Sequence, residues 1–383
     1  MWFSRTILAE LKLWAEKKPG IRKPLILRGA RQVGKTVVGK MFGNSFAPFL
    51  YVNLDKKKER RLFKRDLDVR DIVQALLLAK GKTAENGRAL LFLDEIQECP
   101  EAVAYLRYFH EELPELHVMA AGSLLEIALE KEQIHFPVGR VENRFMHPLS
   151  FREFLEAADA DQVSDLLKTI PFPTYALDLA YEYFHRYTLV GGMPEIVATY
   201  LQNEDITTLQ TLYDSLLTAY IDDADRYAGN RTMAAVLRHC IENAPLQAGQ
   251  RITFQGFGNS NYRSREVGEA LRTLQRAMLV YLIYPTTAVE IPILPDRKKK
   301  PRLQFLDTGL LNHVAGLQAQ YFLYDDLHPL FRGRLPNISS PRSCLPSRQP
   351  EEGNFPSGYA RSHSPRQRWI LSSSIGTRSS RWR

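Results

Sequence analysis

Residues 25–36 read LILRGARQVGKT, and this stretch limits the possible fold more than any other part of the chain. Three apolar residues are followed, after one arginine, by Gly29, Gly34, Lys35 and Thr36 in the spacing G-x-x-x-x-G-K-[ST]. That spacing is typical of a loop between a strand and a helix whose backbone N–H groups face phosphate oxygens. Since glycine makes up about 7% of residues, the pattern arises by chance in roughly one such chain in a hundred. We therefore expect a phosphate-binding loop.

Each position of such a loop has an expected role. The loop amides and the start of the following helix point at the phosphates, and the Lys35 ammonium neutralises the β and γ oxygens. The Thr36 hydroxyl is placed to bind Mg²⁺. The residues expected to contact the nucleotide are Gly29, Ala30, Arg31, Gln32, Val33, Gly34, Lys35, Thr36 and Val37.

Strand and helix patterns alternate around this loop. Apolar runs predict strands over residues 25–27, 49–54, 89–93 and 117–121, with a weaker fifth over 145–149. The intervening segments predict helices over residues 37–42, around 72–77, over 102–113 and over 124–130. This alternation indicates an α/β fold, a parallel sheet with helices on both faces. Ligands of such sheets bind beyond the carboxyl ends of the strands, where the loop would lie.

A second motif, LLFLDEIQ, covers residues 90–97. Its apolar strand delivers Asp94, whose carboxylate is suited to the magnesium site, and the adjacent Glu95 is suited to polarise a water molecule for attack on the γ-phosphate. An Asp-Glu pair at a strand end is usually only solvated, so this motif indicates a site only in combination with the loop motif of residues 25–36. One further strand separates the two motifs along the chain, an order that favours hydrolysis over transfer to a second substrate.

Two more polar residues follow. Ser123 in MAAGSLLE ends the fourth predicted strand, where it is suited both to hydrogen-bond the attacking water or the γ-phosphate and to cap the next helix with Glu126; the two roles are compatible. Arg140 in HFPVGRVENR is a candidate to stabilise the transferring phosphoryl group, in cis or from a neighbouring subunit. A surface ion pair is the alternative for Arg140.

The stretches LILRGARQVGKT, LLFLDEIQ, AAGSLLE, GRV and HPLSFREFL occur in an order that resembles a prokaryotic family of AAA-type P-loop ATPases. In that family a domain of unknown role follows the ATPase module. The resemblance continues through YTLVGGMPEIV and KPRLQFLDTGLLN and covers roughly the first 330 residues. It implies ATP binding with Mg²⁺, and hydrolysis that depends on Lys35, Thr36, Asp94, Glu95 and Ser123.

The region after the ATPase motifs is expected to be helical and then winged-helix-like. The helical part, over residues 159–230, carries Arg186 and Arg226, which are candidates to approach the nucleotide or to lie on solvated helix faces. Over residues 231–330 the order of helices, an ITF strand, a helix, a strand, a basic turn and a strand fits a winged helix. Its candidate DNA contacts are Arg263, Arg265, Arg272, Arg276, Lys298, Lys299 and Lys300. Docking of a protein partner is the alternative.

Charge and composition change near residue 335. Residues 336–383 hold eight Arg, two Glu and twelve Ser and carry +6 of the net charge of +8, so the preceding part is nearly neutral. Such a tail cannot bury enough apolar surface to fold, and we expect disorder over residues 335–383. A shifted reading frame produces tails of this kind, which leaves an unstable, inactive product as one possible outcome.

With 383 residues, several domains are expected. We predict an N-terminal helix over residues 1–20, a P-loop ATPase domain over 21–158, the helical lid over 159–230, and the winged-helix-like domain over 231–330. Three distant cysteines indicate neither a disulfide framework nor a zinc site. Without a signal peptide or an apolar run of about 20 residues, the chain is expected to be cytoplasmic and not in a membrane.

The first functional hypothesis is therefore a Mg²⁺-dependent ATPase that couples the nucleotide to the lid and the winged helix. The alternative is an ATP-responsive DNA-binding regulator with little or no hydrolysis.

Overall fold

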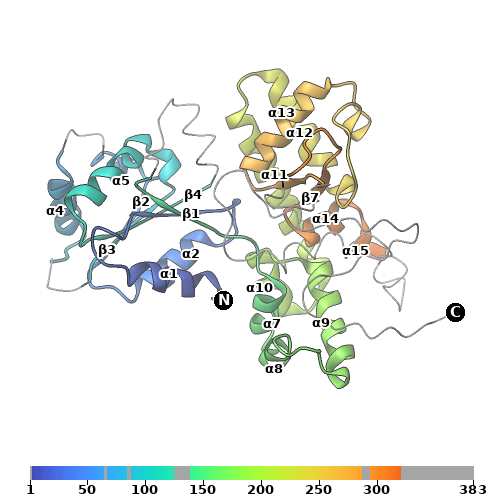
Figure 1. The fold of residues 1–383 in the computed structure, drawn as a ribbon, viewed down its shortest axis with the longest axis horizontal. Helices are drawn as coiled ribbons and strands as arrows, with labels where there is room; N and C mark the ends of the chain where they lie inside the picture. Colours follow the sequence, from blue (N-terminus) through green and yellow to red (C-terminus); the bar gives the residue numbers. More distant parts are fainter. Residues whose placement is uncertain are drawn as a thin grey trace.

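A computed structural model describes residues 2–63, 67–83, 88–123, 125, 139–286 and 294–320. Its first lobe is built on a parallel sheet of five strands in the order β2-β3-β4-β1-β5 (Figure 1). The strands are β1 (Leu25–Arg28), β2 (Phe49–Asn53), β3 (Leu90–Asp94), β4 (His117–Gly122) and β5 (Glu142–Phe145). The fold is thus the α/β sandwich that the alternating pattern predicts, and β4 is inserted between the strands that carry the two motifs.

Helices cover both faces of this sheet, because its central strands are apolar on both sides. In β3, Leu90 and Phe92 belong to the cluster that contains α1 and α2, whereas Leu91 and Leu93 belong to the cluster that contains α4 and α5. All four side chains are buried. The covering helices are α1 (Ile7–Ala15), α2 (Lys35–Gly43), α4 (Val69–Ala79) and α5 (Pro100–Glu112), with a short α3 (Lys57–Arg60) after β2 (Figure 1).

The second lobe is mainly helical. Its helices are α7 (Phe151–Ala157), α8 (Asp161–Leu166), α9 (Leu177–Val190), α10 (Pro194–Asn203), α11 (Gln210–Tyr227), α12 (Arg231–Asn243), α13 (Ser264–Arg276), α14 (Thr308–Val314) and α15 (Leu317–Gln320). An antiparallel pair, β6 (Val280–Ile283) and β7 (Arg302–Phe305), follows α13. Short 3₁₀ turns lie at Ile96–Glu98, Thr174–Ala176, Ile206–Leu209, Pro245–Gln247 and Phe257–Asn259.

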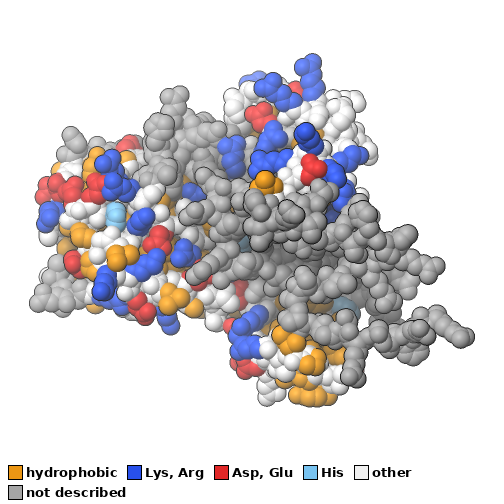
Figure 2. Space-filling model, in the orientation of Figure 1, with side chains coloured by type: hydrophobic (Ala, Val, Ile, Leu, Met, Phe, Trp, Pro, Cys, Tyr) orange, Lys and Arg blue, Asp and Glu red, His pale blue; other side chains and the backbone are white. Residues whose placement is uncertain are grey.

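Side-chain types are unevenly spread over the surface. Figure 2 shows Lys and Arg gathering on the part of the second lobe where Figure 1 places α12 and α13. Exposed apolar side chains gather instead around α8 and α9, at Leu167, Ile170, Tyr175, Leu179 and Tyr181. No helix of the described ranges is long and apolar enough to span a bilayer.

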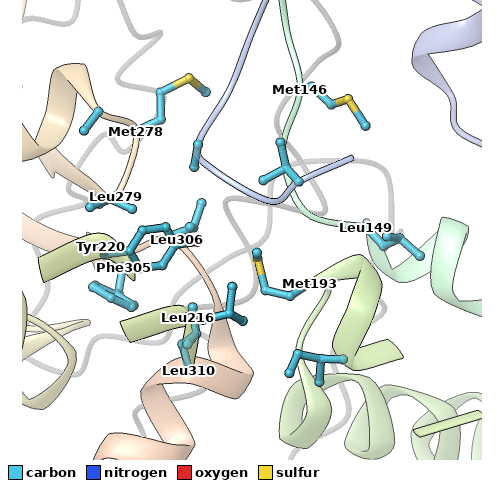
Figure 3. Close-up of a cluster of buried hydrophobic side chains, with 14 of the residues drawn as sticks. Met146, Leu149, Met193, Leu216, Tyr220, Met278, Leu279, Phe305, Leu306 and Leu310 are labelled. Atoms are coloured by element: carbon cyan, nitrogen blue, oxygen red, sulfur yellow. The ribbon is translucent and has the colours of Figure 1, made fainter. Parts of the chain in front are cut away.

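The two lobes share one apolar core. A single buried cluster runs from Phe3 and Leu25 in the first lobe to Leu279 and Leu311 in the second. At its middle, Met146 and Leu149, which follow β5, and Met193, which precedes α10, lie near Tyr220 and Leu306 (Figure 3). The lobes are therefore joined by packed side chains and not only by a linker.

Several predicted boundaries are wrong. The fifth strand spans Glu142–Phe145 and not residues 145–149; it is a polar edge strand whose Glu142 and Arg144 form ion pairs, so the apolar pattern misses it. The ITF strand is absent, and only Arg251 forms an isolated bridge, to Arg302. The last strand stops at Phe305, because Asp307 caps α14 through the N–H groups of Gly309 and Leu310.

Other expectations stay predictions. Of the helix predicted over residues 124–130 only Leu125 is described, and its capping residue Glu126 and the tail over 335–383 lie outside the described residues. The helices α12 and α13 and the β6–β7 pair follow one another in the predicted order. The winged-helix assignment and the domain boundaries remain predictions.

Candidate functional site

Three central strands end together at one edge of the sheet. Register pairs Arg28 of β1 with Gly122 of β4, and Asp94 of β3 with Ala121 of β4. The loop over residues 29–34 leaves β1 at this edge, and α2 begins at Lys35. Ser123 directly follows β4 between the two motifs and is buried. The fold thus brings Lys35, Thr36, Asp94, Glu95 and Ser123 to one edge, as the sequence predicts.

The loop has the backbone geometry of a tight turn into a helix. Gly34 has a φ of 95° and Gln32 a φ of 64°, both left-handed. At Gly29 an added Cβ would lie 2.4 Å from the carbonyl oxygen of Met146, so only glycine fits. Behind the loop, Arg5 Nη1 donates a hydrogen bond to the Val33 carbonyl oxygen (3.0 Å). The loop is therefore supported by the N-terminal segment.

The Lys35 ammonium lies inside the curve of the loop. Its Nζ donates to the carbonyl oxygens of Gly29 (3.0 Å) and Ala30 (2.8 Å), and the residue is buried. Burial lowers the pKa of Lys35 to about 8, while the nearby carboxylates of Glu95 and Asp94 act to raise it. Arg31 acts to lower the same pKa, so a second cation is near this ammonium.

A carboxylate and a hydroxyl suited to Mg²⁺ lie next to the loop. Thr36 Oγ1 donates to Asp94 Oδ1 (3.1 Å), and Tyr51 Oη on β2 donates to Asp94 Oδ2 (3.0 Å). Burial raises the pKa of Asp94, and the two hydrogen bonds act against that rise. Oxygen donors of this kind are those that Mg²⁺ prefers, so Thr36 and Asp94 fit the ion.

Glu95 is held in an uncommon conformation. Its φ of 54° and ψ of 48° are left-handed, which is costly for a residue with a side chain and typical of functional sites. Gln97 Nε2 donates to Glu95 Oε2 (2.6 Å) and so orients the carboxylate. The other end of the Gln97 amide occupies the space beside Gly122, where an added Cβ would lie 2.5 Å from Oε1.

The second lobe reaches the loop through α11. Arg31 Nη1 donates to Asp223 Oδ1 (2.6 Å), and Tyr220 Oη donates to the Arg31 carbonyl oxygen (3.2 Å). Asp223 and Tyr220 are both buried. The loop is thus contacted from both lobes.

Other candidates lie elsewhere. Arg140 precedes β5 at the amino edge of the parallel sheet, opposite the loop, and its Nη1 pairs with Glu111 of α5 (2.6 Å). The structure therefore does not bring Arg140 to the loop of its own chain. Arg186 is on a solvated face of α9, where it pairs with Glu182 (2.5 Å). Val37 is 42% exposed on the first turn of α2.

The candidate DNA contacts on α13 share one face. Arg265, Arg272 and Arg276 are exposed, together with Glu269, while Val267 and other residues of the opposite face are buried. Arg263 is exposed at the N-terminal end of the same helix. The basic residues Lys298, Lys299 and Lys300 are exposed before β7. This face of α13 belongs to the second lobe and is far along the chain from the phosphate-binding loop.

Sequence reasoning missed Tyr51, Gln97, Tyr220, Asp223 and Arg5. Gln97 is part of the quoted LLFLDEIQ stretch, so its proximity to Glu95 is a usable signal. Tyr51 has a weaker signal, a polar tip within an apolar strand. Asp223 is 192 residues from Arg31, and no local pattern links the two.

The sheet order, the loop and the carboxylates at its edge define a P-loop nucleotide-binding protein. Residues 21–155 match the family described as an AAA domain, and residues 181–321 match a family described as a domain of unknown function (DUF8612). The two matches and the fold support an AAA-type P-loop ATPase domain over residues 21–155, followed by a domain of unknown function over residues 181–321. That second match runs across the predicted boundary at residue 230.

Several solved structures are similar to the chain to different degrees. The chain is similar to the Walker-type ATPase PABY2304 of Pyrococcus abyssi, with 15% identity and a TM-score of 0.52 over 82% of this chain and 96% of that one. It also matches the ORC2 protein of Aeropyrum pernix, with 14% identity and a TM-score of 0.33 over 84% and 96% of the two chains. A third match is DnaA of Aquifex aeolicus, with 11% identity and a TM-score of 0.28 over 70% and 87%. No curated protein matches the chain.

Proposed function

We propose that the protein binds Mg²⁺·ATP at the loop over residues 29–36 and hydrolyses it to ADP and phosphate. The observation that carries this proposal is the meeting of Thr36 and Asp94, whose side-chain oxygens lie 3.1 Å apart, beside the buried Lys35. A hydroxyl, a carboxylate and an ammonium in one place match the needs of a metal-bound triphosphate. No other part of the described chain combines these groups with a glycine loop at a helix start.

The residues would divide the work as follows. Loop amides and Lys35 would bind the β and γ phosphates. Thr36 and Asp94 would hold Mg²⁺, which would neutralise charge on the phosphate oxygens. Glu95, oriented by Gln97, accepts the proton of the attacking water as the oxygen of that water bonds to the γ phosphorus and the bond to the β–γ bridging oxygen breaks. Ser123 is positioned to hydrogen-bond the γ-phosphate or the water. We assign no role in this chain's own site to Arg140.

Two substitutions test binding and turnover separately. Lys35→Ala is expected to abolish ATP binding, and Glu95→Gln to preserve binding while phosphate release falls about 100-fold or more. The matched controls are Lys12→Ala on the exposed side of α1 and Glu98→Gln, which sits three residues after Glu95 and pairs with Arg60. Normal hydrolysis by Lys35→Ala would refute the proposal.

A second candidate, from another class, is a DNA-binding regulator in which ATP acts as a conformational ligand. It is supported by the exposed face of α13 with Arg265, Arg272 and Arg276 and by the basic gathering in Figure 2. Glu269 on that face, and a body that is nearly neutral, support docking of a protein partner instead.

Binding to duplex DNA over a salt series separates these roles. If α13 contacts phosphates, the double variant Arg265→Ala/Arg272→Ala should weaken binding and reduce the salt slope by about two. The control is Arg186→Ala, which removes a partly exposed arginine from α9. Tight ATP binding with no phosphate release, together with salt-sensitive DNA binding, would favour the regulator over the ATPase.

A further inference from the structure

Asp223 occupies a position on α11 that the helix otherwise fills with core residues. Tyr213, Leu216, Tyr220, Asp223 and Ala224 recur at helical spacing, and all five are buried. A carboxylate on such a stripe is costly unless a cation pairs with it. Its partner is Arg31, a residue of the phosphate-binding loop, at 2.6 Å.

The same helix also holds the backbone of Arg31. Tyr220 is three residues before Asp223 and hence on the same helix face, and its hydroxyl donates to the Arg31 carbonyl oxygen at 3.2 Å. One loop residue is therefore fixed at its guanidinium and at its main chain by two neighbouring residues of α11. The Arg31 side chain is 43% exposed, so part of its guanidinium remains accessible to a ligand from solvent.

Separating this ion pair on nucleotide binding would be unfavourable. It would leave the Asp223 carboxylate, whose side chain is 6% exposed, without the charge that compensates it. A guanidinium presents five N–H groups in a rigid fork and can bridge two anions at once. Arg31 is thus better suited to bridge Asp223 and a phosphate than to exchange one for the other, and its charge already acts on the Lys35 ammonium.

We propose that Asp223 and Tyr220 of α11 are positioning residues that hold Arg31 against the phosphates, so that the C-terminal domain of unknown function completes the nucleotide site. This inference rests on the proposed binding of Mg²⁺·ATP at the loop. It makes nucleotide affinity depend on a residue 192 positions away in the chain, in the segment matched by the second family.

The test is the dissociation constant of the full chain for Mg²⁺·ATP, measured by calorimetry. Asp223→Asn removes the charge with little change of shape and is expected to raise the dissociation constant about tenfold. Asp222→Asn makes the same change on the exposed side of α11 and should stay within about twofold of the wild type.

A double-variant cycle shows whether the effect acts through Arg31. In an Arg31→Gln background, Asp223→Asn should add less than about twofold, because the group that Asp223 holds is gone. A purely structural role of Asp223 would weaken binding equally in both backgrounds and would overturn the proposal. An unchanged or tighter dissociation constant for Asp223→Asn alone would overturn it as well.

Tyr220→Phe provides an independent variant that preserves the packing of the ring. It should raise the dissociation constant roughly threefold. Tyr213→Phe on the same helix α11 should not, because it removes a hydroxyl that donates to the Val190 carbonyl oxygen of α9. If Asp223→Asn does not fold, an unchanged value for Tyr220→Phe overturns the proposal. Failure of the wild type to bind Mg²⁺·ATP, or normal binding by Lys35→Ala, would instead refute the proposed function.

Discussion

The Asp94 carboxylate accepts a hydrogen bond on each oxygen, from Thr36 at 3.1 Å and from Tyr51 at 3.0 Å. Thr36 belongs to the loop motif, but Tyr51 comes from the neighbouring strand β2. Lys40 lies over the Tyr51 ring, with Nζ 4.4 Å from the ring centroid, and helps to fix it. Tyr51 is thus placed to set the direction in which the Asp94 carboxylate would face a bound Mg²⁺.

Removal of the Tyr51 hydroxyl should weaken metal binding. For Tyr51→Phe we expect the Mg²⁺ concentration that half-saturates turnover to rise about tenfold, since outer partners of metal ligands commonly have effects of this size. The measurement is phosphate release over a Mg²⁺ series at saturating ATP. Tyr105→Phe is the control, because it removes a tyrosine hydroxyl from α5, where that hydroxyl donates to the Leu67 carbonyl oxygen (3.0 Å). An unchanged Mg²⁺ dependence would exclude the positioning role.

At the scale of single residues, the sequence predicts the site side chains that lie within a motif and misses the side chains that other helices and strands bring to the site. Lys35, Thr36, Asp94 and Glu95 are found because each lies within a contiguous pattern at a strand end. Tyr51 depends on the register of β2 against β3. Arg140 fails as a cis candidate because the amino acid sequence does not show that its segment enters β5 at the opposite edge of the sheet.

At the scale of elements, α7 is tied to the N-terminal segment by one buried carboxylate. Glu153 accepts from Arg5 Nε (3.2 Å), from the Thr6 N–H (2.7 Å) and from the Ser150 N–H (2.9 Å), the last as part of a capping box. Burial acts to raise the pKa of Glu153, but the Arg5 charge and these hydrogen bonds lower it below its ordinary 4.5. Arg5 also donates to the Val33 carbonyl oxygen of the phosphate-binding loop, so the contact between Glu153 and Arg5 also affects the candidate nucleotide site.

Glu153→Gln should therefore destabilise the protein in a pH-dependent way. At pH 7 we expect a loss of about 3 kcal/mol in the free energy of unfolding, because Arg5 is left buried beside a neutral amide. Because the pKa of Glu153 is lower in the folded than in the unfolded state, its carboxylate stabilises the fold at pH values above the unfolded pKa. This stabilisation is lost as the pH falls through the folded pKa, so the difference in stability between wild type and Glu153→Gln should shrink below pH 4.5. Urea unfolding at several pH values measures this difference, with Glu156→Gln on the same helix as the control. A difference that stays constant with pH would contradict the role of the Glu153 carboxylate.

The junction of α9 and α10 has no room for a side chain. An added Cβ at Gly192 would lie 2.2 Å from the Leu149 carbonyl oxygen, and Leu149 N–H donates to the Gly192 carbonyl oxygen at 2.6 Å. Gly192→Ala should lower the free energy of unfolding by about 2 kcal/mol or more. Gly229→Ala, where a Cβ meets nothing within 4 Å, is the control in chemical denaturation. Equal stability of the two variants would contradict this packing.

Elements are predicted well where burial alone defines them. Strands β1 to β4 are recovered within a residue or two. In β1, β3 and β4 nearly all residues are buried, so both faces are apolar, whereas β2 buries one face and half-buries the other and is still apolar enough to leave a clear pattern. The edge strand β5 and the segment around Arg251 have no such pattern, since ion pairs and a single bridge define them. The start of α14 depends on Asp307, which reads in sequence as the continuation of a strand.

At the scale of the whole molecule, the cluster in Figure 3 determines whether the two lobes unfold together. It is part of a buried core that extends from Phe3 to Leu311, whereas the second buried cluster lies wholly within the first lobe. Two lobes with separate cores would unfold independently. Lobes that share buried side chains such as Met193 and Tyr220 lose part of both cores when either one opens.

Thermal unfolding followed by calorimetry should therefore show one main cooperative transition. Mg²⁺·ATP at about 100 times its dissociation constant stabilises a protein that binds it only when folded by about 2.7 kcal/mol, so the whole transition should move up by several degrees. Lys35→Ala should unfold in one transition as well but should not respond to the nucleotide. Two transitions, of which only one moves with ATP, would show that the shared core does not couple the lobes, because binding to the loop would then stabilise the first lobe alone.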